Sequence, residues 1–269
     1  MIIDFLTYVL LGIIQGFTEP IPISSSGHLF IFKELFNLNA LKDINFESIV
    51  NFGSFLAIII VFRNDIKALL IDFFKFIKTR EKKYFNHFKY CLLIAIGTIP
   101  AGLVGLLLKD VVEKYSSNLK LIGLALIITA IFLFLIRNLE GKKDDDDISY
   151  KDALKIGLFQ VVALFPGISR SGATIVGAMF SDLKKATAFK FSFMLYLPIS
   201  FCTLFLGTKD LIESNLSIEL WIYYIAGMIA SMIVTLLSVK WFKSILEKGN
   251  LIYFVVYCLI AGTLVIIFL

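Results

Sequence analysis

The sequence predicts an all-α polytopic membrane protein built from inverted-topology repeats, with about six transmembrane helices and two re-entrant helix pairs meeting near the midplane. Composition is the first reason: 58% of the 269 residues are hydrophobic, only 17% are charged, and the mean hydropathy is +0.87. A soluble domain cannot bury so much apolar surface, so a single membrane domain over 1–269 is expected.

An internal repeat is the second reason. Moving the stretch around 12–28 along the chain by about 145 positions places it in register with 157–173. The register aligns Gly12 with Gly157, Gln15 with Gln160, Ile23 with Ile168, Ser24 with Ser169, Ser26 with Ser171, and Gly27 with Gly172. It also sets Glu19 against Leu164, Ser25 against Arg170, and His28 against Ala173, so the chemistry differs between otherwise similar copies. Repeat one is expected over roughly 1–136 and repeat two over 151–269.

The elements follow from the apolar runs. The run 5–14 is shorter than the roughly 20 residues that a helix needs to cross a bilayer, so with a second short helix at 27–36 it is expected to form a re-entrant pair. The segments 153–164 and 172–180 predict the second pair. A polar, basic amphipathic stretch is expected at 65–89. Full spans are expected at 49–62, 90–108, 119–136, 188–206, 220–239 and 251–269.

Basic residues set the orientation. The segment 63–89 alone holds eight Lys and Arg residues, and the alternate connections are poorer in them. The positive-inside rule places the richer set in the cytoplasm, with both termini and the first re-entrant pair on the outside. The linker 137–150 contains Asp144–Asp147, which we interpret as a solvated loop rather than a cation site because such runs repel one another.

Other classes of protein are disfavoured. The net charge of +5 reflects loop lysines and arginines, and no basic soluble face with base-stacking aromatics indicates a nucleic-acid partner. The three cysteines lie in apolar runs without metal-ligand or disulfide spacing. The first residues have no basic region or small-residue cleavage site typical of a signal peptide. Inverted repeats with broken helices are typical of secondary transporters, so transport is one candidate function.

Glu19 and Arg170 lie in short helices at membrane depth. A charge there costs about 2.5–3.5 kcal/mol even on insertion scales, so such residues pair or face a wet cavity. Because the repeat brings the two breaks together, these two residues are expected to be neighbours. A purely structural ion pair is the alternative.

Hydroxyl groups surround both breaks. Serine before a helix is ordinarily an N-cap, and a helix N-terminus with free N–H groups also binds anions such as phosphate. With Arg170 between two such ends, the site would suit an anion with more than one charge. The hydroxyl residues are Ser24, Ser25, Ser26, Ser169, Ser171 and Thr174.

A cation site and a histidine complete the set. Gln15 and Glu19 are four residues apart, share a helix face, and could hold Mg²⁺ or Ca²⁺ beside phosphate. His28 is expected one turn into the next helix, near Ser25, as a base or nucleophile, although a lone histidine is more often a packed polar residue.

These motifs together resemble the bacterial undecaprenyl-diphosphate phosphatase family, the bacitracin-resistance protein type. The resemblance rests on Gln-x-x-x-Glu with Pro-x-Ser-Ser-Ser-Gly-His and on Pro-Gly-x-Ser-Arg-Ser-Gly-x-Thr, and it covers essentially the whole chain. It implies hydrolysis of a polyprenyl diphosphate lipid, undecaprenyl diphosphate, to undecaprenyl phosphate and phosphate, which recycles the carrier lipid for cell-wall synthesis. It also implies a site facing the outer side of the bacterial cytoplasmic membrane.

Transferred position by position, the resemblance gives definite roles. It implies Glu19, Ser25, His28 and Arg170 as catalytic residues, and Gln15 with Glu19 as metal ligands. Phosphate binding is assigned to Ser24, Ser26, Gly27, Gly167, Ser169, Ser171, Gly172 and Thr174. The chain departs from the commoner pattern at Gln15, where the family also has a carboxylate, and at Pro20, where an apolar residue is commoner.

The sequence leaves the nucleophile and the function open. The nucleophile is Ser25, His28 or a water molecule that His28 deprotonates. The rival functions are a polyprenyl-phosphate transporter or flippase and a non-catalytic scaffold, which leaves the polar motifs unexplained. Membrane lipids are the expected surroundings, and a homodimer is compatible with the sequence.

Overall fold

The computed structural model describes residues 2–36, 44–116, 118–213 and 217–269, and these are almost entirely helical. The α-helices in chain order are α1 (Ile2–Thr18), α2 (Ser25–Leu35), α3 (Ile44–Val61), α4 (Arg63–Thr79), α5 (Phe85–Leu107), α6 (Lys109–Ser116), α7 (Leu119–Ile136), α8 (Tyr150–Val162), α9 (Arg170–Met179), α10 (Lys185–Glu213), α11 (Ile218–Glu247) and α12 (Ile252–Phe268). The all-helical membrane architecture predicted from composition is confirmed.

Four helices are long and apolar enough to cross a membrane within the described ranges. They are α7, α10, α11 and the stretch Lys82–Leu107 that contains α5. The apolar helices α3 and α12, expected as full spans, are shorter. The amphipathic stretch 65–89 is α4 followed by a short 3₁₀ turn and the start of α5. The helix α6 lies between the predicted spans 90–108 and 119–136, where the sequence predicts no helix.

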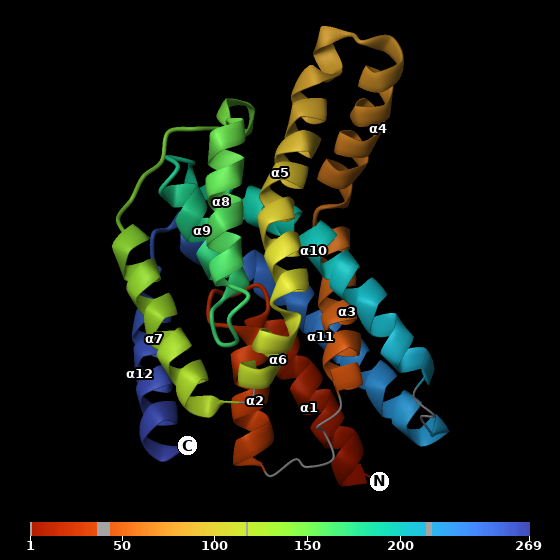
Figure 1. Ribbon diagram of the computed structural model, residues 1–269, viewed down its shortest axis with the longest axis vertical. Helices are drawn as coiled ribbons and strands as arrows, with labels where there is room; N and C mark the ends of the chain where they lie inside the picture. The colour runs from red at the N-terminus through yellow and green to blue at the C-terminus, as the bar shows by residue number, and fades with distance from the viewer. Residues whose placement is uncertain (1, 37–43, 117, 214–216) are drawn as a thin grey trace.

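Two helical hairpins enter the molecule from opposite ends. Figure 1 shows α1 rising from the end that carries the N-terminus, with α2 returning to it, whereas α8 descends from the other end and α9 returns there. Both hairpins turn near the centre of the molecule. The short helices that the two proline-containing motifs predict are therefore arranged with inverted direction.

Each hairpin packs against a long helix from the other half of the chain. α1 lies on α11, where a Cβ added to Gly12 would be 2.1 Å from the carbonyl oxygen of Gly227. α8 lies on α5 in the same manner, with a Cβ added to Gly157 2.5 Å from the carbonyl oxygen of Gly97. Small residues allow such backbone contact between membrane helices, where dispersion replaces the hydrophobic effect.

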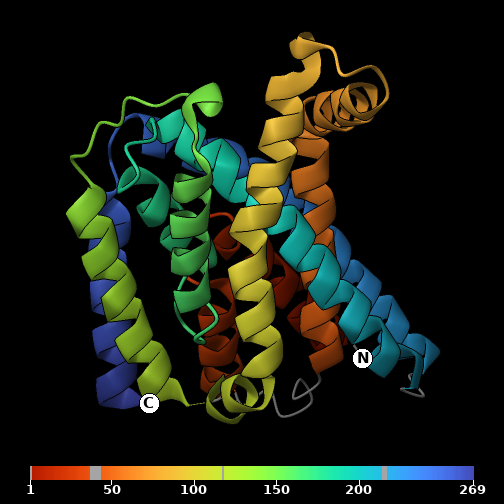
Figure 2. The same ribbon diagram turned by 45° about the horizontal axis from the view of Figure 1, so that its top comes forward.

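α7 and α12 form a third glycine contact between the halves. A Cβ added to Gly123 would lie 2.8 Å from the carbonyl oxygen of Gly262, and the reciprocal distance is 2.6 Å. The two helices run side by side at one edge in both views (Figure 2). The halves are thus interlocked rather than merely adjacent.

The base of the second hairpin is fixed by Asp152 in the first turn of α8. Its carboxylate accepts hydrogen bonds from Lys143 Nζ at 2.8 and 3.0 Å and from the backbone and hydroxyl of Ser149 at 3.0 and 2.7 Å. Burial works against the charge, but these hydrogen bonds outweigh it and hold the pKa of Asp152 below its ordinary value.

Candidate active site

The tips of the two hairpins touch. A Cβ added to Gly27 would lie 3.3 Å from the Cα of Gly167, and one added to Gly172 would lie 3.3 Å from the Cβ of Pro22. The hydroxyl of Ser171 also donates to the carbonyl of Ile21 at 3.3 Å. Substrate-binding positions predicted in separate halves of the chain therefore lie at one place.

Serine caps begin both inner helices, as the sequence predicts. Ser24 caps α2 by accepting from the N–H of Gly27 at 3.3 Å, and it does so with a φ of 69°, a region that L-residues rarely adopt. Ser169 caps α9 by accepting from the N–H of Gly172 at 3.2 Å. Gly167, with a φ of 90°, allows the chain to turn into this cap against Ile122.

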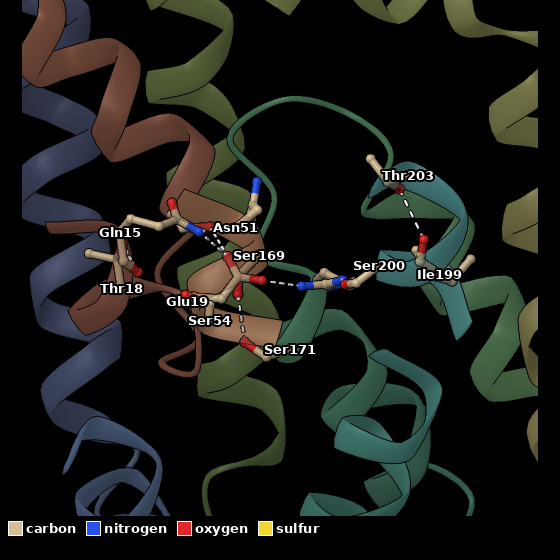
Figure 3. Close-up of polar contacts among 12 residues, drawn as sticks. Gln15, Thr18, Glu19, Asn51, Ser54, Ser169, Ser171, Ile199, Ser200 and Thr203 are labelled. Carbon is tan, nitrogen blue, oxygen red and sulfur yellow. Dashed lines mark hydrogen bonds and ion pairs between the residues drawn. The ribbon is translucent and has the colours of Figure 1, made fainter. Parts of the chain in front are cut away.

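Glu19 lies at the centre of a network of donors. One carboxylate oxygen accepts from Gln15 Nε2 at 2.9 Å and from the hydroxyl of Ser25, and the other is ion-paired with Arg170. Gln15 Nε2 also donates to Asn51 Oδ1 at 2.7 Å. Figure 3 shows Gln15, Asn51 and Glu19 grouped on one side of the site and Ser200 on the other. The expected neighbourhood of Glu19, Ser25 and Arg170 is present.

Arg170 is held by α10 as well as by Glu19. Its Nη1 donates to Ser200 Oγ at 3.1 Å, and its guanidinium lies 4.0 Å from the ring centroid of Tyr196. Neither Tyr196 nor Ser200 was predicted as a site residue. Their polar groups, with that of Ser192, nevertheless recur every four residues in an apolar span and so lie on one helix face.

Ser192 lies on the same face of α10 and contacts α9 one turn after Arg170, at Thr174. The hydroxyl of Thr174 contacts Ser192 Oγ at 2.5 Å and donates to the carbonyl of Arg170 at 2.9 Å. Ser169 and Ser171 are 3.2 Å apart through their hydroxyls, and Ser26 is half-buried at the start of α2. These hydroxyl groups line the start of the two helices, where an anion is favoured.

His28 has different partners from those expected. Its Nδ1 lies 2.7 Å from the carbonyl oxygen of Ser24 and its Nε2 lies 2.6 Å from the hydroxyl of Tyr257, against whose ring it stacks. It borders an apolar cavity with Trp241 and Phe17, whereas Glu19 and Arg170 line another cavity. Ser25 is therefore hydrogen-bonded to Glu19, whereas His28 contacts Tyr257.

The side chains around Glu19 offer oxygen ligands for a hard divalent cation. Among the described residues no three His, Cys, Asp or Glu side chains form a metal cluster. One buried oxygen, Gln15 Oε1, nevertheless has no hydrogen-bond partner and is four positions from the Glu19 carboxylate. A carboxylate and an amide oxygen fit Mg²⁺ or Ca²⁺ when phosphate oxygens and water supply the remaining ligands.

The cavity beside Arg170 is nearly closed. It is bounded by Glu19, Arg170, Ser171 and Tyr196 and has a volume of about 10 Å³, roughly the room for one water molecule. A phosphate group is larger than this cavity, so its entry requires side chains that line the cavity to move.

A larger cavity of about 530 Å³ lies elsewhere, between α4, α5, α10 and the acidic linker. Three of its carboxylates have cationic partners: Lys190 binds Asp65 and Asp145 at 2.8 and 2.9 Å, and Lys184 binds Asp144 at 2.5 Å. Within the aspartate run that was predicted to be a solvated loop, Asp144 and Asp145 therefore pair with lysines just before α10 and within its first turns.

Fold and site together define a polytopic membrane protein with a buried polar centre suited to an anionic group. The chain belongs to the bacitracin resistance protein BacA family, whose profile matches residues 8–264.

Individual members of the family match nearly the full length. The chain is 46% identical over 264 residues to undecaprenyl-diphosphatase 2 of Bacillus thuringiensis, covering 98% of this chain and 97% of that protein. It is 44% identical over 269 residues to undecaprenyl-diphosphatase 1 of Bacillus licheniformis, covering 98% and 99%. The undecaprenyl-diphosphatase of Oceanobacillus iheyensis is 44% identical over 264 residues, covering 97% and 96%.

Proposed function

We propose that this protein is an enzyme that hydrolyses undecaprenyl diphosphate to undecaprenyl phosphate and inorganic phosphate, and so recycles the lipid carrier of cell-wall synthesis. The observation that carries the proposal is the contact of Glu19 with both Ser25 and Arg170 between two helix N-termini. The names of relatives that match almost the full length supply the substrate.

Binding would begin when the diphosphate replaces Glu19 as the partner of Arg170. The guanidinium offers planar donors that match phosphate oxygens, and Ser200 and Tyr196 keep it near the hairpin tips. The capped starts of α2 and α9 add partial positive charge. These groups stabilise the charge on the transferring phosphoryl group, which is the main requirement of phosphoryl transfer.

Ser25 is the nucleophile that the contacts favour. Its hydroxyl proton passes to the Glu19 carboxylate, and Oγ forms a bond to the terminal phosphorus while the bond to the bridging oxygen breaks. Undecaprenyl phosphate leaves with that oxygen. The proton on Glu19 passes to the departing undecaprenyl phosphate, which restores the carboxylate as a base. Glu19 then takes a proton from water, the water oxygen bonds to phosphorus as the bond to Ser25 Oγ breaks, and Glu19 returns that proton to Oγ as inorganic phosphate is released. The catalytic role of His28 stays a prediction because its contacts lead to Tyr257.

A divalent cation belongs to the proposal. Gln15 and Glu19 would hold Mg²⁺ or Ca²⁺ together with phosphate oxygens, and the ion would supply positive charge beside the leaving group. The orphaned oxygen of Gln15 supports this assignment.

The cellular setting is also proposed. A multi-pass protein of this family would lie in the bacterial cytoplasmic membrane, with the lysine- and arginine-rich end inside and the site open to the outer side. Oligomeric state, including a homodimer, stays a prediction.

Phosphate release from undecaprenyl diphosphate by purified protein in detergent tests the function. We expect release by the wild type and loss of release for Arg170→Ala. A protein that releases none, although folded and supplied with Mg²⁺ or Ca²⁺, would contradict the proposal.

A polyprenyl-phosphate transporter is the second candidate, because the hairpins enter from opposite ends as in inverted-repeat transporters (Figure 1). Transport needs two compartments and releases no phosphate. Flux of a labelled polyprenyl phosphate across vesicles by a variant without phosphatase activity would favour this function.

A further inference from the structure

Tyr196 lies beside Arg170, and its hydroxyl group is buried there. Tyr196 is only 4% exposed. Its hydroxyl forms no hydrogen bond of ordinary geometry with the described residues, although the side chains of Arg170 and Ser200 lie near it. Leaving a buried hydroxyl unpaired costs stability, so such groups usually serve a purpose that packing does not supply.

The surroundings of that hydroxyl are those of the candidate active site. Tyr196 lines the cavity of Glu19, Arg170, Ser171 and Thr174, and the charges that act on its hydroxyl are those of Glu19 and Arg170. The carboxylate of Glu19 already receives hydrogen bonds from Gln15, Ser25 and Arg170. The Arg170 guanidinium beside the hydroxyl can only donate hydrogen bonds, so the Tyr196 proton is available to an acceptor that enters next to Arg170.

The ring of Tyr196 is fixed in place by its helix. Ser192, Tyr196 and Ser200 are spaced four residues apart on α10, and all three contact the arginine-bearing hairpin. The guanidinium lies 4.0 Å from the ring centroid, within the range of a cation–π interaction. One face of α10 thus brings the Tyr196 ring and the Ser200 hydroxyl to the Arg170 guanidinium.

We propose that Tyr196 is an additional residue of the phosphate site: its ring holds the Arg170 guanidinium, and its hydroxyl donates a hydrogen bond to a phosphoryl oxygen of the bound diphosphate. Phosphate oxygens are acceptors and the hydroxyl is a donor, so the ligand would satisfy the group that the protein leaves unpaired. This inference rests on the proposed function for the identity of the natural ligand.

Tyr196→Phe removes the hydroxyl and keeps the ring, and the chain offers a matched control. Tyr90 is also 4% exposed and its hydroxyl is also unpaired, but it borders the separate cavity near Lys190. Tyr90→Phe therefore makes the same chemical change at equal burial, away from Arg170.

Two measurements are needed on both variants and the wild type in detergent. One is kcat/KM with undecaprenyl diphosphate, and the other is the rise in melting temperature on adding inorganic pyrophosphate. For Tyr196→Phe we expect kcat/KM to fall about tenfold or more, as for a lost hydrogen bond to a charged group, and the pyrophosphate shift to shrink. Tyr90→Phe should match the wild type in both.

Equal behaviour of the two variants in both measurements would overturn the inference. A lower melting temperature of Tyr196→Phe without ligand would also overturn it, because it would show that the hydroxyl has a partner in the protein. If the wild type releases no phosphate, the proposed function fails, and the pyrophosphate shift alone still decides whether Tyr196 binds phosphate.

Discussion

The carboxylate of Glu19 and the guanidinium of Arg170, 151 positions apart in the chain, form an ion pair where the two hairpins meet. The Glu19 side chain is 4% exposed and that of Arg170 is 25% exposed, so the pair is largely withdrawn from solvent. A buried ion pair contributes little net stability, whereas loss of one partner leaves a costly charge. Its value here is that it presents both groups to the same small cavity.

Backbone contact between α1 and α11 should be essential for holding the first hairpin. Gly12→Ala places a Cβ about where the Gly227 carbonyl lies, and overpacking of this kind costs about 1–3 kcal/mol. We expect a lower melting temperature and reduced activity. Gly102→Ala is the control, because nothing lies within 4 Å of its added Cβ, and alanine favours the helix. Equal effects of the two substitutions would contradict the glycine contact.

A covalent intermediate should form on Ser25. Rapid acid quench of enzyme mixed with labelled undecaprenyl diphosphate should trap acid-stable phosphoserine at residue 25 and none in Ser25→Ala. An acid-labile phosphoenzyme that disappears in His28→Gln would instead make His28 the nucleophile. Absence of any trapped species at a reaction time shorter than one turnover would favour direct attack by water.

A second carboxylate at residue 15 should strengthen cation binding. Gln15→Glu places two carboxylates four residues apart on one helix face, so the Mg²⁺ or Ca²⁺ concentration giving half of the maximal rise in melting temperature should fall several-fold. The same shift should appear in the cation dependence of phosphate release, and excess chelator should abolish release by the wild type. A cation-induced rise in melting temperature that is unchanged in Gln15→Glu would exclude residue 15 as a ligand.

Asp152 should make the stability of the second hairpin depend on pH. Because its folded-state pKa lies below the ordinary value of about 3.9, its contribution is present above that value and is lost as the pH falls through the folded pKa. Asp152→Asn should therefore lower the melting temperature at pH 7, and the difference from wild type should shrink below about pH 4. A difference that persists unchanged at acid pH would show that packing, not charge, holds this cap.

Much of the fold could be predicted from the sequence because long apolar runs indicate membrane helices. α7 agrees with the predicted span 119–136 at both ends, and both predicted pairs of short helices are present as hairpins. α6 was not predicted because most of its eight residues are polar, and the helical start of α5 was assigned to the basic stretch before it. Local hydropathy does not distinguish a polar helix from a polar connection.

The site residues that lie within the two repeated motifs could be predicted from the sequence. Glu19, Ser25 and Arg170 meet as the register of the repeats implies. Tyr196 and Ser200 could not be found in this way, because their approach to Arg170 depends on how α10 crosses the second hairpin. The partner of His28 was equally hidden, because Tyr257 is 229 positions away and reaches it only through the packing of α12.

The most direct measurement of the shared centre is a double-mutant cycle on kcat/KM for phosphate release with Glu19→Gln, Arg170→Gln and the combined variant. If the two side chains act in one centre, each single substitution removes most of the activity and the combined variant is hardly worse than the more damaged single variant. Losses that multiply in the combined variant, or a single variant with near-normal activity, would contradict the account.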